Sequence, residues 1–171
     1  MFDQSLLLPE LQKPVSDLWL RAIAEGESCS GIALGELLEG HLAMTLASYA
    51  TNVGLCRRVA IEVLSAPEEK KDASGGSLID IASRCLLIAG LFPGLARARN
   101  VDFGYYSDLG RGAYAAHAAY WIGRGMHRWA QQSEAAAERF PDLVGTLWGM
   151  RRLEQVQEKL AALANFGVVL N

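Results

Sequence analysis

The chain has 171 residues, of which 51% are hydrophobic and 20% charged, and its net charge is −3. This length suits one domain with a sizeable core rather than two, and the composition is typical of a globular protein. The slight acidic excess argues against broad nucleic-acid binding. The longest uncharged apolar run, 85–96, is shorter than the ~20 residues that a membrane-spanning helix needs.

The N-terminal residues, MFDQSLLLPELQKP, lack the basic segment and the small-residue cleavage site of a secretory signal peptide. The three cysteines, Cys29, Cys56 and Cys85, are widely spaced and form no CxxC pair. An odd number of distant cysteines favours free thiols in a reducing compartment. We therefore expect a soluble, cytoplasmic protein.

Apolar residues recur at helical spacing along the chain, and no stretch shows the alternation of a strand. One such stripe predicts a helix over about 30–52, and a shorter helix is expected over about 54–65. The charged, glycine-containing segment 66–76 predicts a flexible loop. The stripe of the first helix consists of Leu34, Leu38, Leu42, Thr45 and Tyr49.

The segment 78–92 is apolar on nearly all sides, which is typical of a buried helix, and we expect it at the centre of the fold. Ser77 is the expected N-cap, assisted by Asp80, and Pro93 ends the helix. Asp102 is the expected N-cap of a long helix over about 103–130. After a polar, alanine-rich stretch, Pro141 opens a last helix that reaches about residue 165.

The long helix over 103–130 divides into two faces when its residues are placed at 100° intervals. We expect the face of small residues to pack against the central helix, because small side chains allow two backbones to approach closely. The small face carries Gly112, Ala115, Ala116, Ala119, Ile122, Gly123 and Met126. The opposite, aromatic and basic face carries Tyr106, Gly110, Tyr114, His117, Trp121, Arg124 and Arg128.

The aromatic and basic face has two interpretations. Its rings cover a neighbouring helix while its arginines extend to water, or it binds a partner or a ligand. Tyr, Trp and Arg are enriched at protein interfaces, which favours a protein partner over a small molecule. The candidate binding residues are Tyr106, Arg111, Tyr114, His117, Trp121 and Arg124.

Known site motifs are incomplete in this chain. Gly110-Arg-Gly-Ala-Tyr-Ala115 matches a loose dinucleotide fingerprint, but that fingerprint needs a preceding strand. No metal-ligand spacing and no nucleophile motif is present, and His41 is expected to be solvated or to make a local contact. Five arginines between 97 and 128 are spread out rather than clustered, which makes nucleic acid an unlikely partner. We expect no catalytic residue, no metal and no cofactor.

A segment over 86–118 resembles a group of uncharacterised helical bacterial proteins. In that group an apolar helix ends at Phe-Pro, and Tyr-Tyr and Gly-Arg-x-Ala-Tyr follow. The matching residues here are Phe92-Pro93, Tyr105-Tyr106 and Gly110-Arg111-Gly112-Ala113-Tyr114. The resemblance covers about a fifth of the chain, and it implies an all-helical fold and a bacterial origin, with no activity attached.

Together these features predict a single all-α domain spanning 1–171, a bundle of about six or seven helices. The leading functional hypothesis is a non-enzymatic protein that binds another protein through a helical surface, as a homodimer that uses aromatic and small-residue helix faces. The alternative is a small-molecule-binding protein or enzyme, with a pocket between the helices over 78–92 and 103–130. Tyr106, Arg111, Tyr114 and His117 would line that pocket.

Overall fold

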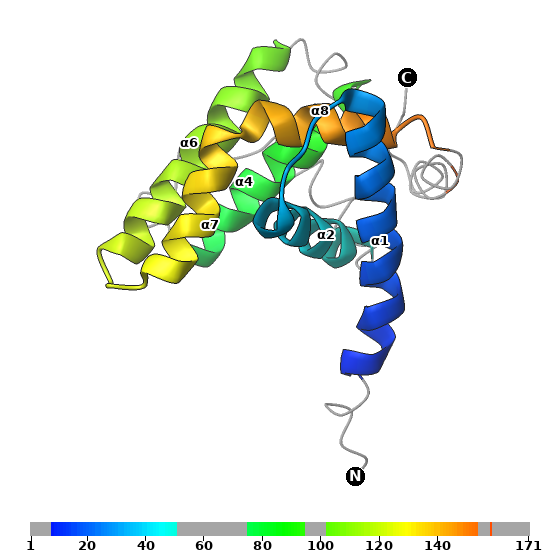
Figure 1. Ribbon diagram of the computed structural model, residues 1–171. Helices are drawn as coiled ribbons and strands as arrows, with labels where there is room; N and C mark the ends of the chain where they lie inside the picture. The colour runs from blue at the N-terminus through cyan, green and yellow to red at the C-terminus, as the bar shows by residue number, and fades with distance from the viewer. Residues whose placement is uncertain (1–7, 51–74, 95–101, 154–157, 159–171) are drawn as a thin grey trace.

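The computed structural model describes residues 8–50, 75–94, 102–153 and 158 (Figure 1). Within these residues the chain is helical and has no strand, which confirms the predicted all-α bundle. No described helix is both long enough and apolar enough to cross a membrane. The helices are α1 (Leu8–Ser30), α2 (Glu36–Ala50), α4 (Gly75–Gly90), α6 (Phe103–Ile122), α7 (His127–Glu138) and α8 (Phe140–Met150).

The helices pack around α4 and α8 rather than in a simple parallel stack. α6 and α7 form a hairpin along one side of the molecule, with α4 against the other side of α6 (Figure 1). α8 runs across the top of the bundle and contacts both α4 and α1. α2 lies between α1 and α7, so that residues from four helices, α2, α4, α6 and α7, meet near the middle of α6.

The central position of α4 is confirmed, because Ala82, Ser83 and all residues from 85 to 91 are buried. The helix begins at Gly75, so Ser77 lies inside its first turn and the predicted N-cap is wrong. Asp80 has a different role from the one expected. Its carboxylate pairs with Arg84 one turn later at 2.6 Å and accepts a hydrogen bond from the Tyr49 hydroxyl of α2 at 3.0 Å.

The helix predicted over 30–52 begins later than expected, and α1 has no counterpart among the predicted elements. Residues 31–35 form the loop between α1 and α2. Gly31 has a φ of 70°, and the N–H of Ile32 donates back to the Glu27 carbonyl, which ends α1. Within α2, the stripe residues Leu38, Leu42 and Thr45 are buried, as expected for the inward side of the helix.

The long helix predicted over 103–130 is in fact two helices. Gly125 has a φ of 72°, the N–H of Gly125 donates to the Ile122 carbonyl, and the N–H of Met126 donates to the Trp121 carbonyl. This pair of bonds around a left-handed glycine is the Schellman motif that ends helices. The chain therefore reverses at residues 123–126 and α7 returns along α6. The N-cap at Asp102 is confirmed, because its carboxylate accepts a hydrogen bond from the Gly104 N–H.

The C-terminal helix begins close to the expected place, with Pro141 in the first turn of α8, and ends at Met150. The rest of the predicted segment to 165 lies outside the described residues, apart from residues 151–153 and 158. The helix expected over 54–65 also lies outside them. Of the loop expected over 66–76, residues 75 and 76 belong to α4, and the others are not described.

Arg139 ties the corner between α7 and α8 to the α1–α2 loop. Its guanidinium donates to the carbonyls of Ala33 and Leu34, at 2.7 and 2.8 Å, and to the carboxylate of Asp142 at 2.9 Å. The loop is also held from the other side, because the Glu27 carboxylate accepts a hydrogen bond from the Leu34 N–H. These contacts fix where α2 starts, and hence where His41 lies in the bundle.

Candidate functional site

α6 is oriented opposite to the expectation. Its aromatic face is buried, with Tyr106, Tyr114 and His117 each at most 7% exposed. The small residues that were expected against the central helix are exposed instead. Large rings remove far more apolar area from water than alanines and glycines do, which favours their burial. The exposed small-face residues are Gly112, Ala115, Ala116, Ala119, Ile122, Gly123 and Met126.

On α6 itself, close approach to the neighbouring helices requires a glycine on the aromatic face. A Cβ at Gly110 would lie 2.6 Å from Cζ of Phe140 and 3.0 Å from Cβ of Cys85. Gly112, on the exposed side, would place a Cβ with nothing within 4 Å. The need for a small residue is therefore local to Gly110.

A buried polar cluster forms where α2, α4, α6 and α7 meet. The Tyr114 hydroxyl lies 2.7 Å from Nε2 of His41, and both side chains are buried. Burial raises the pKa of Tyr114, and a hydrogen bond with the Ser83 side chain opposes that shift in part. The phenol therefore stays protonated and can donate to a neutral His41 imidazole.

His117 extends this cluster towards the α6–α7 turn. The indole N–H of Trp121 donates to Nε2 of His117 at 2.8 Å, and Nδ1 of His117 lies 2.6 Å from the Ser133 hydroxyl of α7. Because an indole nitrogen is only a donor, Nε2 carries no proton and Nδ1 donates to Ser133. The hydrogen bonds thus select a single neutral tautomer of His117.

Both imidazoles are held in the neutral state by their surroundings. Burial, together with a smaller effect of the nearby His117, lowers the pKa of His41 to about 4. Burial also lowers the pKa of His117. Cys85 is buried as well, which raises the pKa of its thiol and leaves it un-ionised at neutral pH. The Tyr114 phenol and both imidazoles thus each have a hydrogen-bond partner within the cluster.

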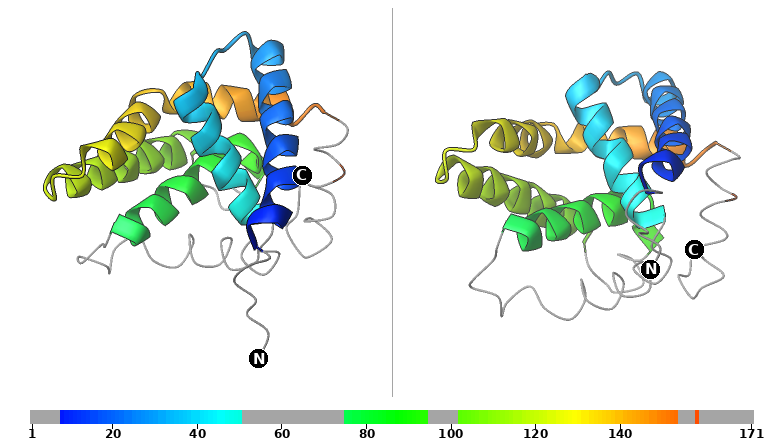
Figure 2. Two further views of the ribbon diagram at one scale, coloured as in Figure 1. Left: turned by 60° about the horizontal axis from the view of Figure 1, so that its bottom comes forward. Right: turned by 90° about the horizontal axis from the view of Figure 1, so that it is seen from below.

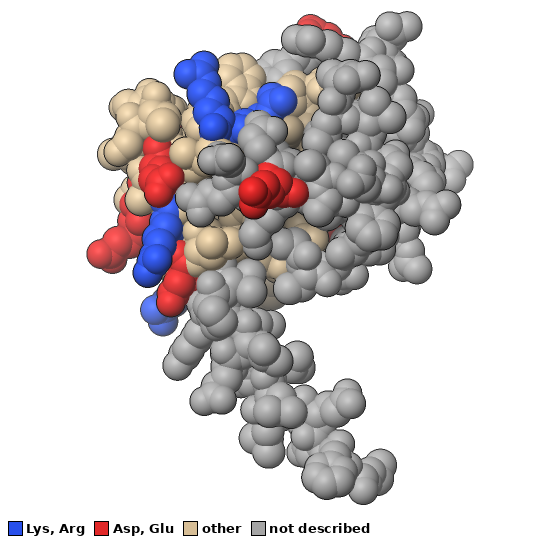
Figure 3. Space-filling model, turned by 90° about the vertical axis from the view of Figure 1, so that its right-hand side faces the viewer, with Lys and Arg blue, Asp and Glu red and all other residues tan. Residues whose placement is uncertain are grey.

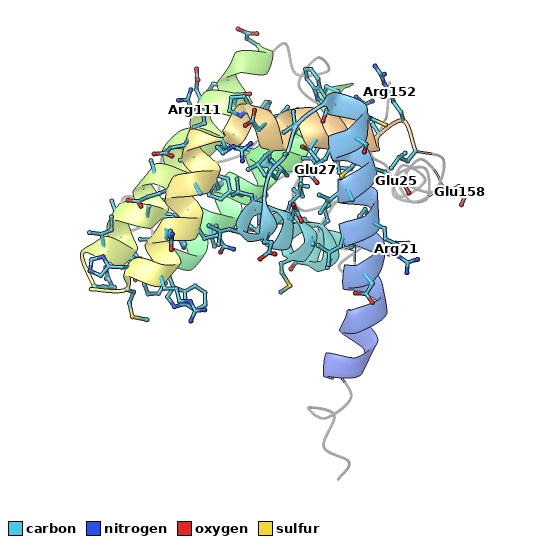
Figure 4. The ribbon with its side chains drawn as sticks, in the orientation of Figure 1. Arg21, Glu25, Glu27, Arg111, Arg152 and Glu158 are labelled. Atoms are coloured by element: carbon cyan, nitrogen blue, oxygen red, sulfur yellow. The ribbon has the colours of Figure 1, made fainter. Side chains whose placement is uncertain are left out.

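The structure brings only some of the predicted site residues close to one another. Tyr114, His117 and Trp121 belong to the polar cluster or its edge. Tyr106 lies in a separate buried cluster with Cys85 and Ile88. Arg111 is exposed on the outer side of α6 (Figure 4). Arg124 is also exposed, with its guanidinium 3.5 Å above the Tyr120 ring.

The sequence reasoning missed two members of the cluster. His41 was expected to be solvated or to make a local contact, but it is 7% exposed and bonded to Tyr114, 73 residues away, so that expectation is wrong. Ser133 was assigned only to a polar stretch. The signal for His41 was present, because it lies between Leu38, Leu42 and Thr45 on the inward side of the predicted helix. Ser133 had no such signal until the reversal at Gly125 placed α7 beside α6.

An apolar and basic surface lies at the end of the α6–α7 hairpin, which we call the hairpin tip. It consists of Ile122, Arg124, Met126, Arg128 and Trp129, all exposed. Trp129 is 57% exposed and lies 6.1 Å from Trp121, measured between ring centroids. The tip projects at one end of the molecule (Figure 2). No acidic residue occurs in the sequence between Asp108 and Glu134.

The charged side chains of the hairpin tip are all basic. On the face shown in Figure 3, the described basic and acidic side chains are interspersed. Within the described residues, no group of three or more His, Cys, Asp or Glu side chains is placed to hold a metal ion.

Comparison of the chain with protein-family models, with curated proteins and with solved structures gives no match. The resemblance of residues 86–118 to helical bacterial proteins therefore stays a prediction.

Proposed function

We propose that this protein acts by binding another protein through the hairpin tip. The observation that carries this proposal is the exposure of three large apolar side chains within eight residues, Ile122, Met126 and Trp129. Single exposed apolar residues are common on soluble proteins, but a group of them at one turn, with arginines beside them, is typical of an interaction surface. Most of the aromatic face of α6 is unsuited to that role, because Tyr106, Tyr114 and His117 are already buried in the bundle.

The polar cluster supports the tip in this proposal. Trp121 is fixed by its hydrogen bond to His117, and its ring contacts those of Tyr120 and Trp129. A surface held on two packed helices binds with a smaller loss of conformational entropy than a mobile loop does. The cluster would thus position the tip without contacting the partner.

The same contacts argue against the alternative function, a small-molecule pocket between α4 and α6. Arg111, one of the residues expected to line the pocket, is exposed on the outer side of α6, whereas Tyr114 and His117 face inward. Both inward side chains already have hydrogen-bond partners, since Tyr114 bonds with His41 and His117 bonds with Ser133. An enzyme or a small-molecule-binding protein built on these residues would need the cluster to open.

A site-specific photo-crosslinker tests the interaction in the cells that express the protein. We expect benzoylphenylalanine at Met126 to give a covalent protein adduct, and the same group at Ala24, which is exposed on α1, to give none. Trp129→Ser should remove the Met126 adduct, whereas Leu20→Ser, a change at an exposed apolar residue of α1, should leave it. Equal adducts from both positions, or none from Met126, would reject the proposal.

A further inference from the structure

We infer that His117 is a proton-operated latch on the hairpin tip, which holds Trp121 in place while the imidazole is neutral and releases it when a proton binds to Nε2. The latch consists of the side chains of His117, Trp121 and Ser133, which come from both helices of the hairpin. Its effect on partner binding rests on the proposed function, because it regulates the same surface. Its operation is a property of the chain alone.

The two ring nitrogens of His117 have opposite hydrogen-bonding roles. Nε2 accepts from the indole N–H of Trp121 at 2.8 Å, and Nδ1 donates to the Ser133 hydroxyl at 2.6 Å. An imidazolium is a donor at both nitrogens, and an indole nitrogen cannot accept. A proton on Nε2 therefore points at the indole N–H, so that two donors face each other. The bond to Ser133 survives protonation, and the change acts on Trp121.

Trp121 is placed to pass this change to the hairpin tip. It is half-buried in the last turn of α6, directly before the reversal of the chain. Its ring centroid lies 5.2 Å from that of Tyr120 and 6.1 Å from that of Trp129. Tyr120 in turn carries the guanidinium of Arg124, 3.5 Å above its ring. A movement of the Trp121 ring therefore alters the support of both an apolar and a basic group of the tip.

Mild acid favours the released form of the latch. Burial lowers the pKa of His117 below its usual value of 6.5, so the imidazole is neutral and the latch is closed at neutral pH. When Trp121 moves away, Nε2 is open to water and the cause of the lowered pKa is relieved. Because the released form binds the proton more tightly, a fall in pH shifts the equilibrium towards it.

The titratable groups around the cluster leave His117 as the one bonded to Trp121 within the described residues. His41, which enters the cluster from α2, has a pKa that His117 helps to lower, so a charge on one imidazole disfavours a charge on the other. The thiol of Cys85 on α4 stays un-ionised. The charged side chains of the neighbouring helices are paired, as in Asp80 with Arg84 and Asp142 with Arg139, exposed, as in Glu36, His127, Arg128, Glu134 and Glu138, or half-buried in the first turn of α2, as in Glu39.

NMR of the purified chain, titrated from about pH 7.5 to about pH 5, tests the latch. The indole N–H signals of the four tryptophans are followed, and Trp121→Phe identifies the signal of Trp121. We expect this signal to move with the same midpoint as the His117 imidazole, and the Trp129 signal to move with it. Solvent exchange of the Trp121 indole proton should rise about tenfold relative to that of Trp148 at the same pH. Trp148 is the internal control, because its indole N–H donates to the Ala89 carbonyl, which does not titrate.

Two variants assign the effect to His117. In His117→Gln the amide can accept from Trp121 and donate to Ser133 but cannot bind the proton. Its Trp121 signal should therefore stay the same over the whole pH range. His127→Gln, a change at an exposed histidine of α7, should keep the wild-type titration.

The outcomes separate the latch from the proposed function. Titration of Trp121 and Trp129 together with His117, abolished in His117→Gln, supports the latch. A Trp121 signal that does not follow His117, or unfolding of the chain before His117 titrates, overturns it. If His117→Gln does not fold, the wild-type titration decides by these same criteria. A Met126 adduct without the titration keeps the proposed function and rejects the latch, whereas the titration without an adduct does the reverse.

Discussion

The indole N–H of Trp121 donates to Nε2 of His117 at 2.8 Å, one helical turn earlier on α6. This bond joins the buried polar cluster to the exposed hairpin tip. His117 reaches Ser133 on α7 through its other nitrogen, so the same imidazole also links the two helices of the hairpin. Four predictions follow from the contacts around these residues and from the packing of α6.

Replacing Trp121 with Phe should weaken the hairpin. The ring remains, but Nε2 of His117 loses its donor and is left partly buried without that bond. We expect the free energy of unfolding to fall by about 1–3 kcal/mol, measured by chemical denaturation. The pKa of His117 should rise, because the donor that favours its neutral form is gone. Trp129→Phe, at an exposed position, is the control. It should change the free energy of unfolding and the pKa of His117 less than Trp121→Phe does.

Stability should fall in mild acid because His41 is buried as a neutral imidazole. Its pKa is lowered to about 4 in the folded protein, against 6.5 for the unperturbed side chain. Between these values the unfolded chain binds a proton that the folded chain does not. As far as His41 is concerned, the free energy of unfolding therefore has its full value above pH 6.5. It decreases as the pH falls towards 4, by at most about 3 kcal/mol.

Denaturation curves recorded from pH 7 to pH 4 measure this dependence. In His41→Gln the slope of stability against pH should decrease, even if the variant is less stable throughout. His127→Gln, a change at an exposed histidine, serves as the control and should keep the wild-type slope. An unchanged slope in His41→Gln would mean that another group causes the acid sensitivity.

Two glycines of α6 should respond to alanine in opposite directions. Gly110→Ala places a Cβ against Phe140 and Cys85, and we expect a loss of about 1–3 kcal/mol or more in stability. Gly112→Ala adds a methyl group on the exposed side of the same helix, where nothing lies within 4 Å. It should stabilise the protein by up to about 1 kcal/mol through helix propensity. Thermal unfolding of both variants reports which side of α6 faces the core, and the reverse order would contradict the orientation.

Arg139→Lys should loosen the α1–α2 loop although the charge is kept. A lysine ammonium lacks the planar fork with which the guanidinium reaches the two loop carbonyls and Asp142 together. Because Arg139 is partly exposed, we expect a loss of only about 1–2 kcal/mol. Amide exchange of Leu34 and Leu38, whose N–H groups are bonded within and next to the loop, should become faster. Arg21→Lys, at an exposed position on α1, is the matched control and should leave the exchange unchanged.

The composition and periodicity of the sequence determined the all-α fold, the central apolar helix and the cap at Asp102, because these depend on spacing and on local hydrogen bonds. The sequence also contains a signal for the helix ends at Gly31 and Gly125, namely the glycines themselves. Both needed a left-handed glycine to be recognised, and each glycine lies among residues that otherwise favour a continuous helix. Because the helix end at Gly125 was not recognised, one long helix was predicted over 103–130, where the structure has α6, a reversal and α7.

Only the tertiary structure decided which face of α6 is buried. A helix with rings on one side and small residues on the other can pack either way, and the choice depends on the surfaces of the helices beside it. Here α4 and α8 present Cys85 and Phe140 to Gly110, so the aromatic face enters the core and the small face meets water. The pairing of His41 with Tyr114 was likewise beyond the sequence, because 73 residues separate two side chains that meet only when α2 docks on α6. Local spacing determines helices, whereas contacts between distant residues are set by how all the helices fill one core.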